Sequence, residues 1–206
     1  MHMLRRTSAA TVIIGALALS IASTAPASAA TLHQASTSDA PPPATSSGPL
    51  DTSDPVVAAK IAELEANGEE LVGGASAEYT PMDAPSDGTV TPQVFPAGCG
   101  LSVLLTQSGL TMRSTNITSC TSVYTTAEME SWMGFWAWLT WDNEVASNTE
   151  YSVATSSFTN DYTYSCVNSN NTRFHTETYG ELSIGGTNYS AAAYDENDED
   201  VACGTS

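Results

Sequence analysis

The sequence predicts an all-β protein, an antiparallel β-sandwich stapled by two disulfides. Short segments in which apolar and polar residues alternate recur through the second half of the 206-residue chain, separated by Gly, Asn and Ser. A Gly-Gly pair divides the clearest of these segments, as a tight hairpin requires. All four cysteines follow an N-terminal segment with the features of an export signal, so we expect them to be oxidised. They are Cys99, Cys120, Cys166 and Cys203.

The first 29 residues have the three parts of a signal peptide. Arg5 and Arg6 supply a positive n-region, residues 9–22 form an apolar h-region, and residues 27–29 are a small-residue cleavage site. The apolar run is shorter than the roughly 20 residues that a membrane-spanning helix needs, which favours cleavage over an uncleaved anchor. We therefore expect residues 1–29 to be removed and the mature protein to be secreted and extracellular.

The charge of the chain excludes two classes of partner. The whole sequence carries a net charge of −18, and removing the signal leaves three basic residues against 23 acidic ones, a net charge of −20. Nucleic acids and anionic lipid surfaces bind clustered Lys and Arg, so neither is an expected partner. After the signal, the longest apolar run, residues 132–139, is too short to span a membrane.

Residues 30–96 have the composition of a linker. The stretch up to about residue 52 is Ser, Thr, Ala and Pro, with three prolines at 41–43, and residues 73–96 return to Gly, Ser, Pro and acidic residues. This pattern predicts a disordered, acidic, Pro-rich linker and a domain at residues 97–206.

One short helix is predicted inside this linker, near residues 54–67. Ser53 or Asp54 can cap it, Pro55 suits its first turn, and Gly68 can end it. A helix this short is marginal alone, which favours a transient helix in a spacer over a pro-segment or docking helix. Its apolar positions are Val56, Val57, Ile61 and Leu64.

The strand pattern of the domain predicts which cysteines pair. Residues 101–106 and 110–117 flank a turn at 107–109, and this hairpin brings Cys99 close to Cys120. Alternating residues 162–166 lead Cys166 toward a final strand that contains Cys203. Chain entropy would slightly favour the nested pairing, because it closes longer loops. The preference for pairing Cys99 with Cys120 and Cys166 with Cys203 therefore rests on the strand pattern alone. Each crosslink should contribute about 3–4 kcal/mol to a domain of modest core.

The hairpin closed by Gly185-Gly186 has a defined register. If Ile184 faces Thr187, one face is apolar and lines the core, and the other is a solvated polar stripe. Strands of this length and spacing favour an immunoglobulin-like sandwich. The core pairs are Leu182 with Tyr189, Gly180 with Ala191 and Thr178 with Ala193, and the solvated stripe is Arg173, His175, Glu177 and Glu181.

The Trp-rich segment 125–144 permits two interpretations. As a helix it has a capping box at Thr125 and Glu128; as a hairpin it turns near Gly134. The hairpin is favoured because aromatic residues suit strands and the helix would be apolar almost all round. One face of this hairpin would expose an aromatic strip, a binding surface for sugar rings or a protein, unless another element covers it. The strip is Trp132, Trp136 and Trp138.

The order of these features resembles a group of small exported four-cysteine β-sandwich proteins from high-GC Gram-positive bacteria. The likeness covers Gly98 to Cys203 and implies a fold and export, but no catalytic residue. It rests on the two cysteine-linked segments and the Trp-bearing hairpin, with Arg173, Tyr179, Gly185-Gly186, Tyr189 and Ser190 between Cys166 and Cys203.

No catalytic residue, metal site or cofactor is predicted. The acidic run 195–200 lacks the Gly and Glu of an EF-hand loop, so a solvated turn is expected. His175 and Glu177 lack a nucleophile, so His175 is expected to be a surface histidine. The cysteines are expected to be oxidised and therefore unavailable to zinc. A carboxylate pair for glycoside hydrolysis could come from Glu128, Glu130, Asp142 and Glu144, but the sequence does not fix their separation.

These observations favour a secreted, non-enzymatic binding module that acts at or outside the cell envelope. Its expected partner is an envelope glycan or another exported protein. The alternatives are a small secreted hydrolase or antibacterial effector, and an exported stress or surface protein. A solvent-open Trp strip would support binding, whereas two carboxylates facing each other across a cleft would support catalysis.

Overall fold

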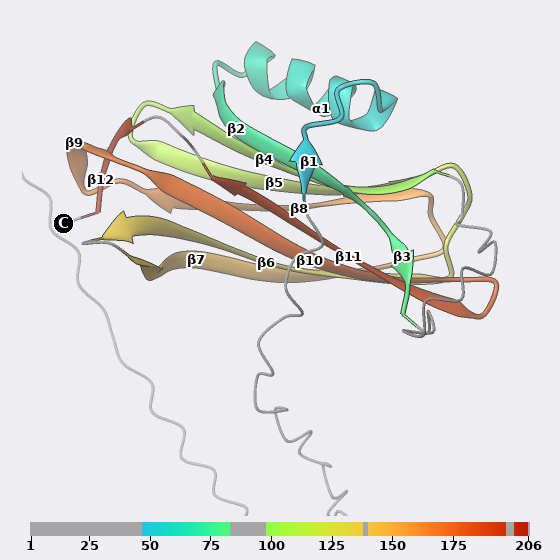
Figure 1. The fold of residues 1–206 in the computed structure, drawn as a ribbon. Helices are drawn as coiled ribbons and strands as arrows, with labels where there is room; N and C mark the ends of the chain where they lie inside the picture. Colours follow the sequence, from blue (N-terminus) through green and yellow to red (C-terminus); the bar gives the residue numbers. More distant parts are fainter. Residues whose placement is uncertain (1–46, 83–97, 138–139, 197–199, 206) are drawn as a thin grey trace, which may run out of the picture. The chain divides into compact units, whose positions relative to one another are not determined.

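The protein is an antiparallel β-sandwich with one helix and two disulfides, as predicted. The computed structural model describes residues 47–82, 98–137, 140–196 and 200–205. Sheet A has the strand order β1-β2-β4-β5-β8, sheet B has the order β3-β11-β10-β6-β7, and β12 pairs with β9 in a small third sheet (Figure 1). The elements are β1 (Gly48–Pro49), α1 (Pro55–Ala66), β2 (Glu70–Glu78), β3 (Thr80–Pro81), β4 (Cys99–Ser108), β5 (Thr111–Cys120), β6 (Thr126–Ala137), β7 (Thr140–Val153), β8 (Ser157–Ser165), β9 (Asn168–Thr172), β10 (Phe174–Ile184), β11 (Thr187–Glu196) and β12 (Val201–Gly204).

The hairpin of β10 and β11 has the predicted register. Ile184 pairs with Thr187 and Leu182 with Tyr189, and the alternate residues along both strands are buried. Gly185 and Gly186 both have positive φ angles, 59° and 85°. A residue with a side chain would be strained at either position.

Both predicted disulfides are present. Cys99 and Cys120 are directly opposite each other on β4 and β5, with Cα atoms 4.0 Å apart. Cys166, which follows β8, is bonded to Cys203 on β12. The first bond therefore lies within sheet A, and the second joins the edge of sheet A to the small third sheet.

The Trp-rich segment forms a hairpin, as favoured, but its turn is not near Gly134. Strand β6 continues through Gly134 to Ala137, and the two residues between β6 and β7 lie outside the described part of the chain. Phe135 pairs with Phe174, and their rings lie 6.5 Å apart in the core, so the strand must extend past Gly134. The register with β7 shifts between Met133 and Gly134, so the glycine accompanies a bulge rather than a turn.

The prediction of a linker is wrong for residues 48–82. Strand β2 pairs with β4, and α1 packs on the outer side of sheet A (Figure 1). The glycines of β2 have the composition of a flexible linker, but in the fold they let neighbouring side chains pack closely against the backbone of the strand. A Cβ on Gly73 would lie 2.0 Å from the carboxylate of Asp195, and one on Gly74 would lie 2.9 Å from Leu50. The rest of the predicted linker and the predicted signal peptide lie outside the described residues.

The predicted helix is present and docked. Asp54 caps it, with its Oδ1 accepting the backbone N–H of Val56 at 2.7 Å. Val57 and Leu64 are only 1% and 3% exposed and belong to an apolar cluster beneath the helix. The docking-helix interpretation therefore describes α1 better than the transient helix that was favoured. The cluster also contains Leu104, Ile117, Leu50, Val56, Ile61 and Leu71.

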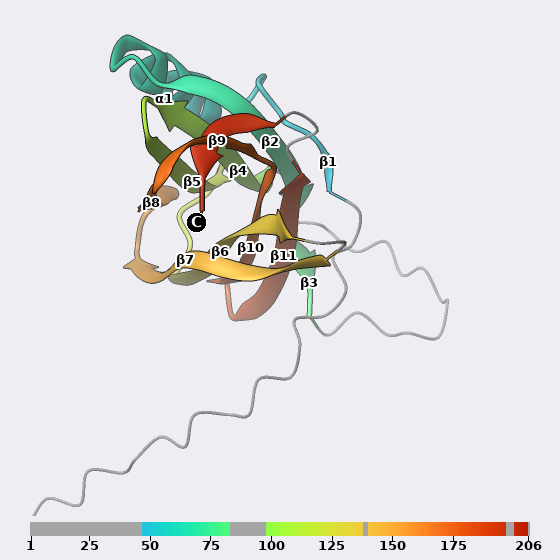
Figure 2. The ribbon, with the colours of Figure 1, turned by 90° about the vertical axis from the view of Figure 1, so that its left-hand side faces the viewer.

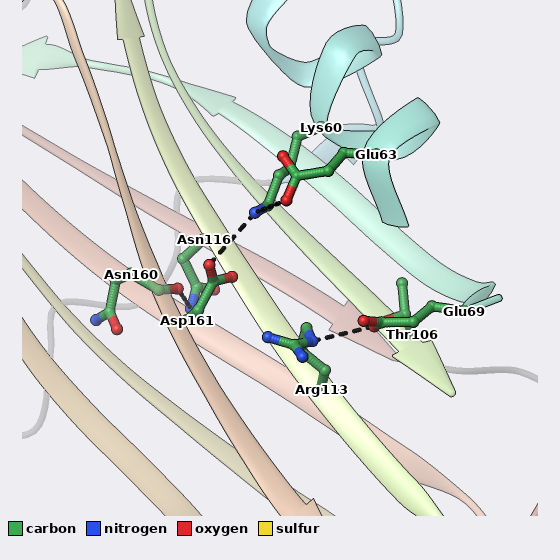
Figure 3. A network of polar contacts seen from close by, with 8 residues as sticks. All are labelled: Lys60, Glu63, Glu69, Thr106, Arg113, Asn116, Asn160 and Asp161. Atoms are coloured by element: carbon green, nitrogen blue, oxygen red, sulfur yellow. Dashed lines mark hydrogen bonds and ion pairs between the residues drawn. The ribbon is translucent and has the colours of Figure 1, made fainter. Parts of the chain in front are cut away.

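Two ion pairs fasten this N-terminal segment to the sheet. Lys60 on α1 lies 3.4 Å from Asp161 on β8, and Arg113 on β5 lies 3.0 Å from Glu69, which precedes β2 (Figure 3). The Glu69 carboxylate also accepts a hydrogen bond from Thr106 at 2.6 Å. Two of the three basic side chains in the described part of the chain are therefore used to hold the segment in place.

Two clusters of buried apolar side chains form the interior between the sheets, and each includes cysteine residues of one disulfide. One cluster includes Cys99, Cys120, Leu101 and Tyr189; the other includes Cys203 and Phe174. Both clusters draw side chains from sheets A and B, so the two sheets pack face to face. Figure 2 shows the strands of both sheets around this interior.

Between the two clusters lies a layer of hydrogen-bonded polar side chains. Asn116 on β5 accepts a hydrogen bond from Thr178 on β10 at 2.5 Å, and its amide donates to the backbone carbonyl of Asn160 at 3.1 Å. Ser114 and Thr176 are 2.7 Å apart. The bonds from Asn116 to Thr178 and from Ser114 to Thr176 join sheet A to sheet B directly, and all five side chains are fully buried.

The edges of the two sheets also meet. On one side, the Asn148 amide on β7 donates to Asn160 on β8 at 2.8 Å, and Asn160 donates back to the Asn148 carbonyl at 3.2 Å. On the other, the backbone N–H of Tyr194 on β11 donates to Ser47, which precedes β1, at 3.0 Å. Polar contacts at both edges therefore limit sliding of one sheet past the other.

Docking of α1 predicts a large effect at Leu64. Leu64→Ala should lower the free energy of unfolding by about 2–5 kcal/mol, because it removes a buried side chain between the helix and the sheet. Leu110→Ala is the matched control, since Leu110 is 48% exposed and its truncation should change stability by less than about 0.5 kcal/mol. Urea denaturation of the oxidised proteins measures both values, and equal effects would contradict a docked helix.

Close packing predicts a second effect at Gly180. A Cβ there would lie 2.2 Å from the hydroxyl of Tyr79, a buried side chain that donates to or accepts from Thr118. Gly180→Ala should therefore destabilise the fold by about 1–3 kcal/mol. Gly100→Ala, whose Cβ would meet nothing closer than 3.9 Å, should be neutral or slightly stabilising. Thermal unfolding distinguishes the two, and an unchanged Tm for Gly180→Ala would refute the contact.

Candidate functional site

The outer face of sheet B is lined with carboxylates and aromatic rings. Along β6 and β10 alternate residues point to the core, and the residues between them point outward. We call the outward set the acidic face. It consists of Glu128, Glu130 and Trp132 on β6, Glu177, Tyr179 and Glu181 on β10, and Tyr151 on β7.

Aromatic side chains hydrogen-bond three of the four carboxylates. The Tyr179 hydroxyl donates to Glu181 at 2.9 Å. Burial raises the pKa of Tyr179 to about 12, and the adjacent carboxylate adds to this rise. Tyr151 is hydrogen-bonded to Glu128 in the same way.

Glu177 is a half-buried carboxylate of the face. It pairs across the strands with Trp132, and the indole N–H donates to it. Burial raises the pKa of Glu177, an effect that the hydrogen bond from Trp132 partly offsets. The stripe that was predicted to be solvated therefore holds a half-buried carboxyl at its centre.

His175 is buried, so the prediction of a surface histidine is wrong. It is 4% exposed, and its ring lies 5.6 Å from that of Tyr194 on the neighbouring strand. Strand alternation alone would place the His175 side chain on the solvent side, but the large ring of Tyr194 covers its imidazole. Burial lowers the pKa of His175 to about 4, so the imidazole is neutral at physiological pH.

A hollow of about 390 Å³ lies beyond the acidic face, toward the Cys166–Cys203 end. It is open to solvent and combines two aromatic side chains with several polar ones. Trp136, near the end of β6, is 40% exposed there. The other lining residues are Phe135, Asn171, Thr172, Arg173, Asp200 and Thr205, and we call the whole the Trp136 pocket.

Three segments distant in sequence form this pocket. Strand β6 brings Trp136, whose backbone N–H donates to the Arg173 carbonyl at 2.9 Å, and the pairing of β9 with β12 brings Asn171 near Asp200. The Cys166–Cys203 bond ties β12 to the end of β8. The disulfide thus helps to fix one wall of the pocket.

Arg173 differs from the other two cations of the described chain. Lys60 and Arg113 lie 3.2 Å and 3.0 Å from a carboxylate oxygen, whereas Arg173 lies 3.7 Å from Asp200. Its Nε is buried and makes no hydrogen bond to any described residue, but the side chain as a whole is 41% exposed. The guanidinium of Arg173 is therefore less firmly engaged by carboxylates than the cationic groups of Lys60 and Arg113.

The predicted Trp strip is realised in part. Trp132 and Trp136 both occur at outward positions of β6, and four residues of extended strand separate them by about 13 Å. Trp132 is partly covered and Trp136 is exposed. Trp138 lies outside the described residues, so its predicted place in the strip is not described.

Of the carboxylates considered for hydrolysis, Glu128 and Glu130 share one face of β6 and do not face each other across a cleft. Glu128 and Glu181 are directly opposite on neighbouring strands and line a shallow hollow of about 170 Å³. Side chains opposite each other on one sheet face stand roughly parallel, so both carboxylates point outward. Glu130 is on the same face; Asp142 and Glu144 are on β7, where only the backbone is described.

A further hollow of about 460 Å³ lies between the segment before α1 and strands β2 and β4. It has no aromatic lining residue, and two of its carboxylates already have partners. Asp54 caps α1, and Asp51 accepts the Ser53 hydroxyl at 2.6 Å. This hollow is therefore a weaker candidate than the Trp136 pocket.

Within the described ranges, no group of three or more His, Cys, Asp or Glu side chains is placed to bind a metal ion. In the same part of the chain, no helix has both the length and the apolar character that crossing a membrane requires.

Sequence reasoning missed Arg173 and Asp200 as members of one site. The strand pattern predicts Arg173 on a solvated stripe, and the acidic run predicts Asp200 in a turn. The predicted Cys166–Cys203 bond indicates that the segments containing Arg173 and Asp200 lie close together. It does not indicate which of their side chains line a hollow with Trp136.

Comparison of the chain with protein-family models, curated proteins and solved structures found no match.

Burial of His175 predicts a specific pH dependence. The imidazole has a pKa near 6.5 in the unfolded chain and about 4 in the fold, so acidification favours the unfolded state. The free energy of unfolding should fall as pH is lowered from about 6.5 toward 4, and His175→Gln should remove this contribution. Urea denaturation at pH 7 and pH 5 measures it. Glu177, with its raised pKa, acts in the opposite direction in both proteins, so the comparison isolates His175.

Identical pH dependence of the free energy of unfolding in the two proteins would contradict the lowered pKa of His175 in the fold.

Proposed function

We propose that this protein is a secreted, non-enzymatic module that binds an envelope polysaccharide through the Trp136 pocket. The observation that carries the proposal is the exposed Trp136 indole beside Arg173 and Asp200 in one open hollow. An aromatic ring with a few convergent polar groups is the usual composition of a small-ligand site.

The pocket offers complementary groups to a sugar. The flat indole of Trp136 can pack on the apolar face of a pyranose ring. Arg173 and Asn171 can donate hydrogen bonds to hydroxyl or acetamido oxygens, while Asp200 can accept from hydroxyl groups. A neutral sugar makes use of both the donors and the acceptor.

Charge supports a neutral ligand rather than an anionic one. The chain carries a net charge of −18, and Asp200 lies beside the only cation of the pocket. A polyanionic polymer would be repelled on approach, because like charges slow association. Uronic acid polymers and phosphate-linked polymers are therefore not the proposed ligands.

Secretion is part of the proposal. Two disulfides are typical of proteins that mature in an oxidising compartment. The first 29 residues have the composition of a signal peptide. Both features support a site of action at or beyond the cell envelope.

Hydrolysis is less well supported than binding. A glycosidase needs two carboxyl groups that flank the scissile bond. Here Glu128 and Glu181 stand side by side on an open face, each hydrogen-bonded to a tyrosine. These two carboxylates therefore do not flank a cleft.

The proposal is tested by titrating the oxidised protein with hexamers of N-acetylglucosamine and of glucose in a calorimeter. At least one should bind, and Trp136→Ala and Arg173→Gln should each weaken binding about tenfold or more. Val167→Ala, which truncates another exposed apolar residue outside the pocket, should leave the Kd unchanged. Absence of binding to both hexamers, or equal Kd values for all variants, would contradict the proposed function.

A further inference from the structure

The acidic face has no cationic partner among the described residues. It presents four carboxylates, and none of the basic side chains in the described ranges pairs with any of them. Lys60 and Arg113 are engaged on the opposite sheet, and Arg173 pairs with Asp200 beyond the end of the face. The hydrogen bonds that these carboxylates do receive come from uncharged Tyr and Trp groups.

This arrangement opposes the stability of the fold. Glu128 and Glu181 are directly opposite on neighbouring strands, and like charges in that position are destabilising. Glu177 is partly removed from water beside Trp132, which a carboxylate tolerates poorly without a cation. A bound cationic partner would relieve both costs.

Aromatic rings accompany the carboxylates in a way that suits an ammonium group. Trp132 pairs with Glu177, and Tyr179 pairs with Glu130 in the next outward row. An ammonium group is attracted both by a carboxylate and by the face of an aromatic ring. The rows are about 6.7 Å apart, so the face provides a series of such positions along the strands.

The acidic face is continuous with the Trp136 pocket. Glu128, Glu130, Trp132 and Trp136 are all outward positions of the single strand β6. The eight residues from Trp136 to Glu128 span about 27 Å of extended backbone. A polymer seated at Trp136 can therefore continue over the carboxylates.

We propose that the acidic face binds free amino groups of the same polysaccharide, which makes the ligand a partly deacetylated amino-sugar polymer. This inference depends on the proposed function, since the Trp136 pocket holds a neutral unit of that polymer. The ammonium groups of its deacetylated units lie over Glu177, Glu130 and the pair Glu128 and Glu181. Charge complementarity between this face and the polymer selects it over a fully acetylated chain.

The test compares two hexamers of N-acetylglucosamine, one fully acetylated and one with half of its units deacetylated, by calorimetry at low ionic strength. The partly deacetylated hexamer should bind about tenfold more tightly. Glu177→Gln with Glu130→Gln should abolish this difference and leave binding of the acetylated hexamer unchanged. Glu78→Gln is the matched control, because Glu78 is an exposed glutamate on β2 of the other sheet, and it should preserve the difference.

Each outcome has a defined meaning. Equal affinities for the two hexamers, or a preference that survives the double substitution, would overturn this inference and leave the proposed function standing. Binding of a lysine hexamer as tight as that of the deacetylated sugar, and equally sensitive to the double substitution, would replace the polysaccharide with a basic peptide and overturn it too. Binding of neither sugar, together with no binding of the glucose hexamer, would overturn the proposed function itself.

Discussion

The hydrogen bonds between the two sheets, centred on Asn116 and Asn160, are the constraint on which the rest of the structure depends. Neither disulfide joins sheet A to sheet B, so the sheets are held by packing and by this buried polar layer. Apolar contacts alone would tolerate small shifts of one sheet over the other. A buried amide does not, because a lost partner costs about 1–3 kcal/mol. The layer therefore fixes the register in which β6 and β10 present the acidic face.

The distribution of the few basic side chains follows a simple division. Lys60 and Arg113 fasten the N-terminal segment to sheet A, and Arg173 stands at the far end of sheet B. The outer face of sheet A is thereby covered by α1, and the outer face of sheet B is left with carboxylates and rings. The two faces of the sandwich are chemically different for this reason.

The parts of the fold that could be predicted are those set by local pattern. The register of the hairpin at Gly185-Gly186 follows from two adjacent glycines, and the pairing of Cys99 with Cys120 follows from one short hairpin. Strand β2 could not be recognised, because Gly73 and Gly74 have the composition of a linker and their purpose is visible only against Asp195 and Leu50. The candidate site depends on contacts of the same non-local kind. Alternation placed Trp136 outward, but the closeness of Arg173 and Asp200 depends on the pairing of β9 with β12.

The position of the Cys166–Cys203 bond has a consequence for when the protein can act. The bond anchors β12, and Asp200 and Thr205, the residues on either side of that strand, line the Trp136 pocket. Before oxidation, this wall is held without a covalent link, by the pairing with β9 and by the burial of Val201. A newly made chain in a reducing compartment would thus present an incomplete pocket. Under the proposed function, the pocket would therefore be complete for sugar binding only once this bond has formed.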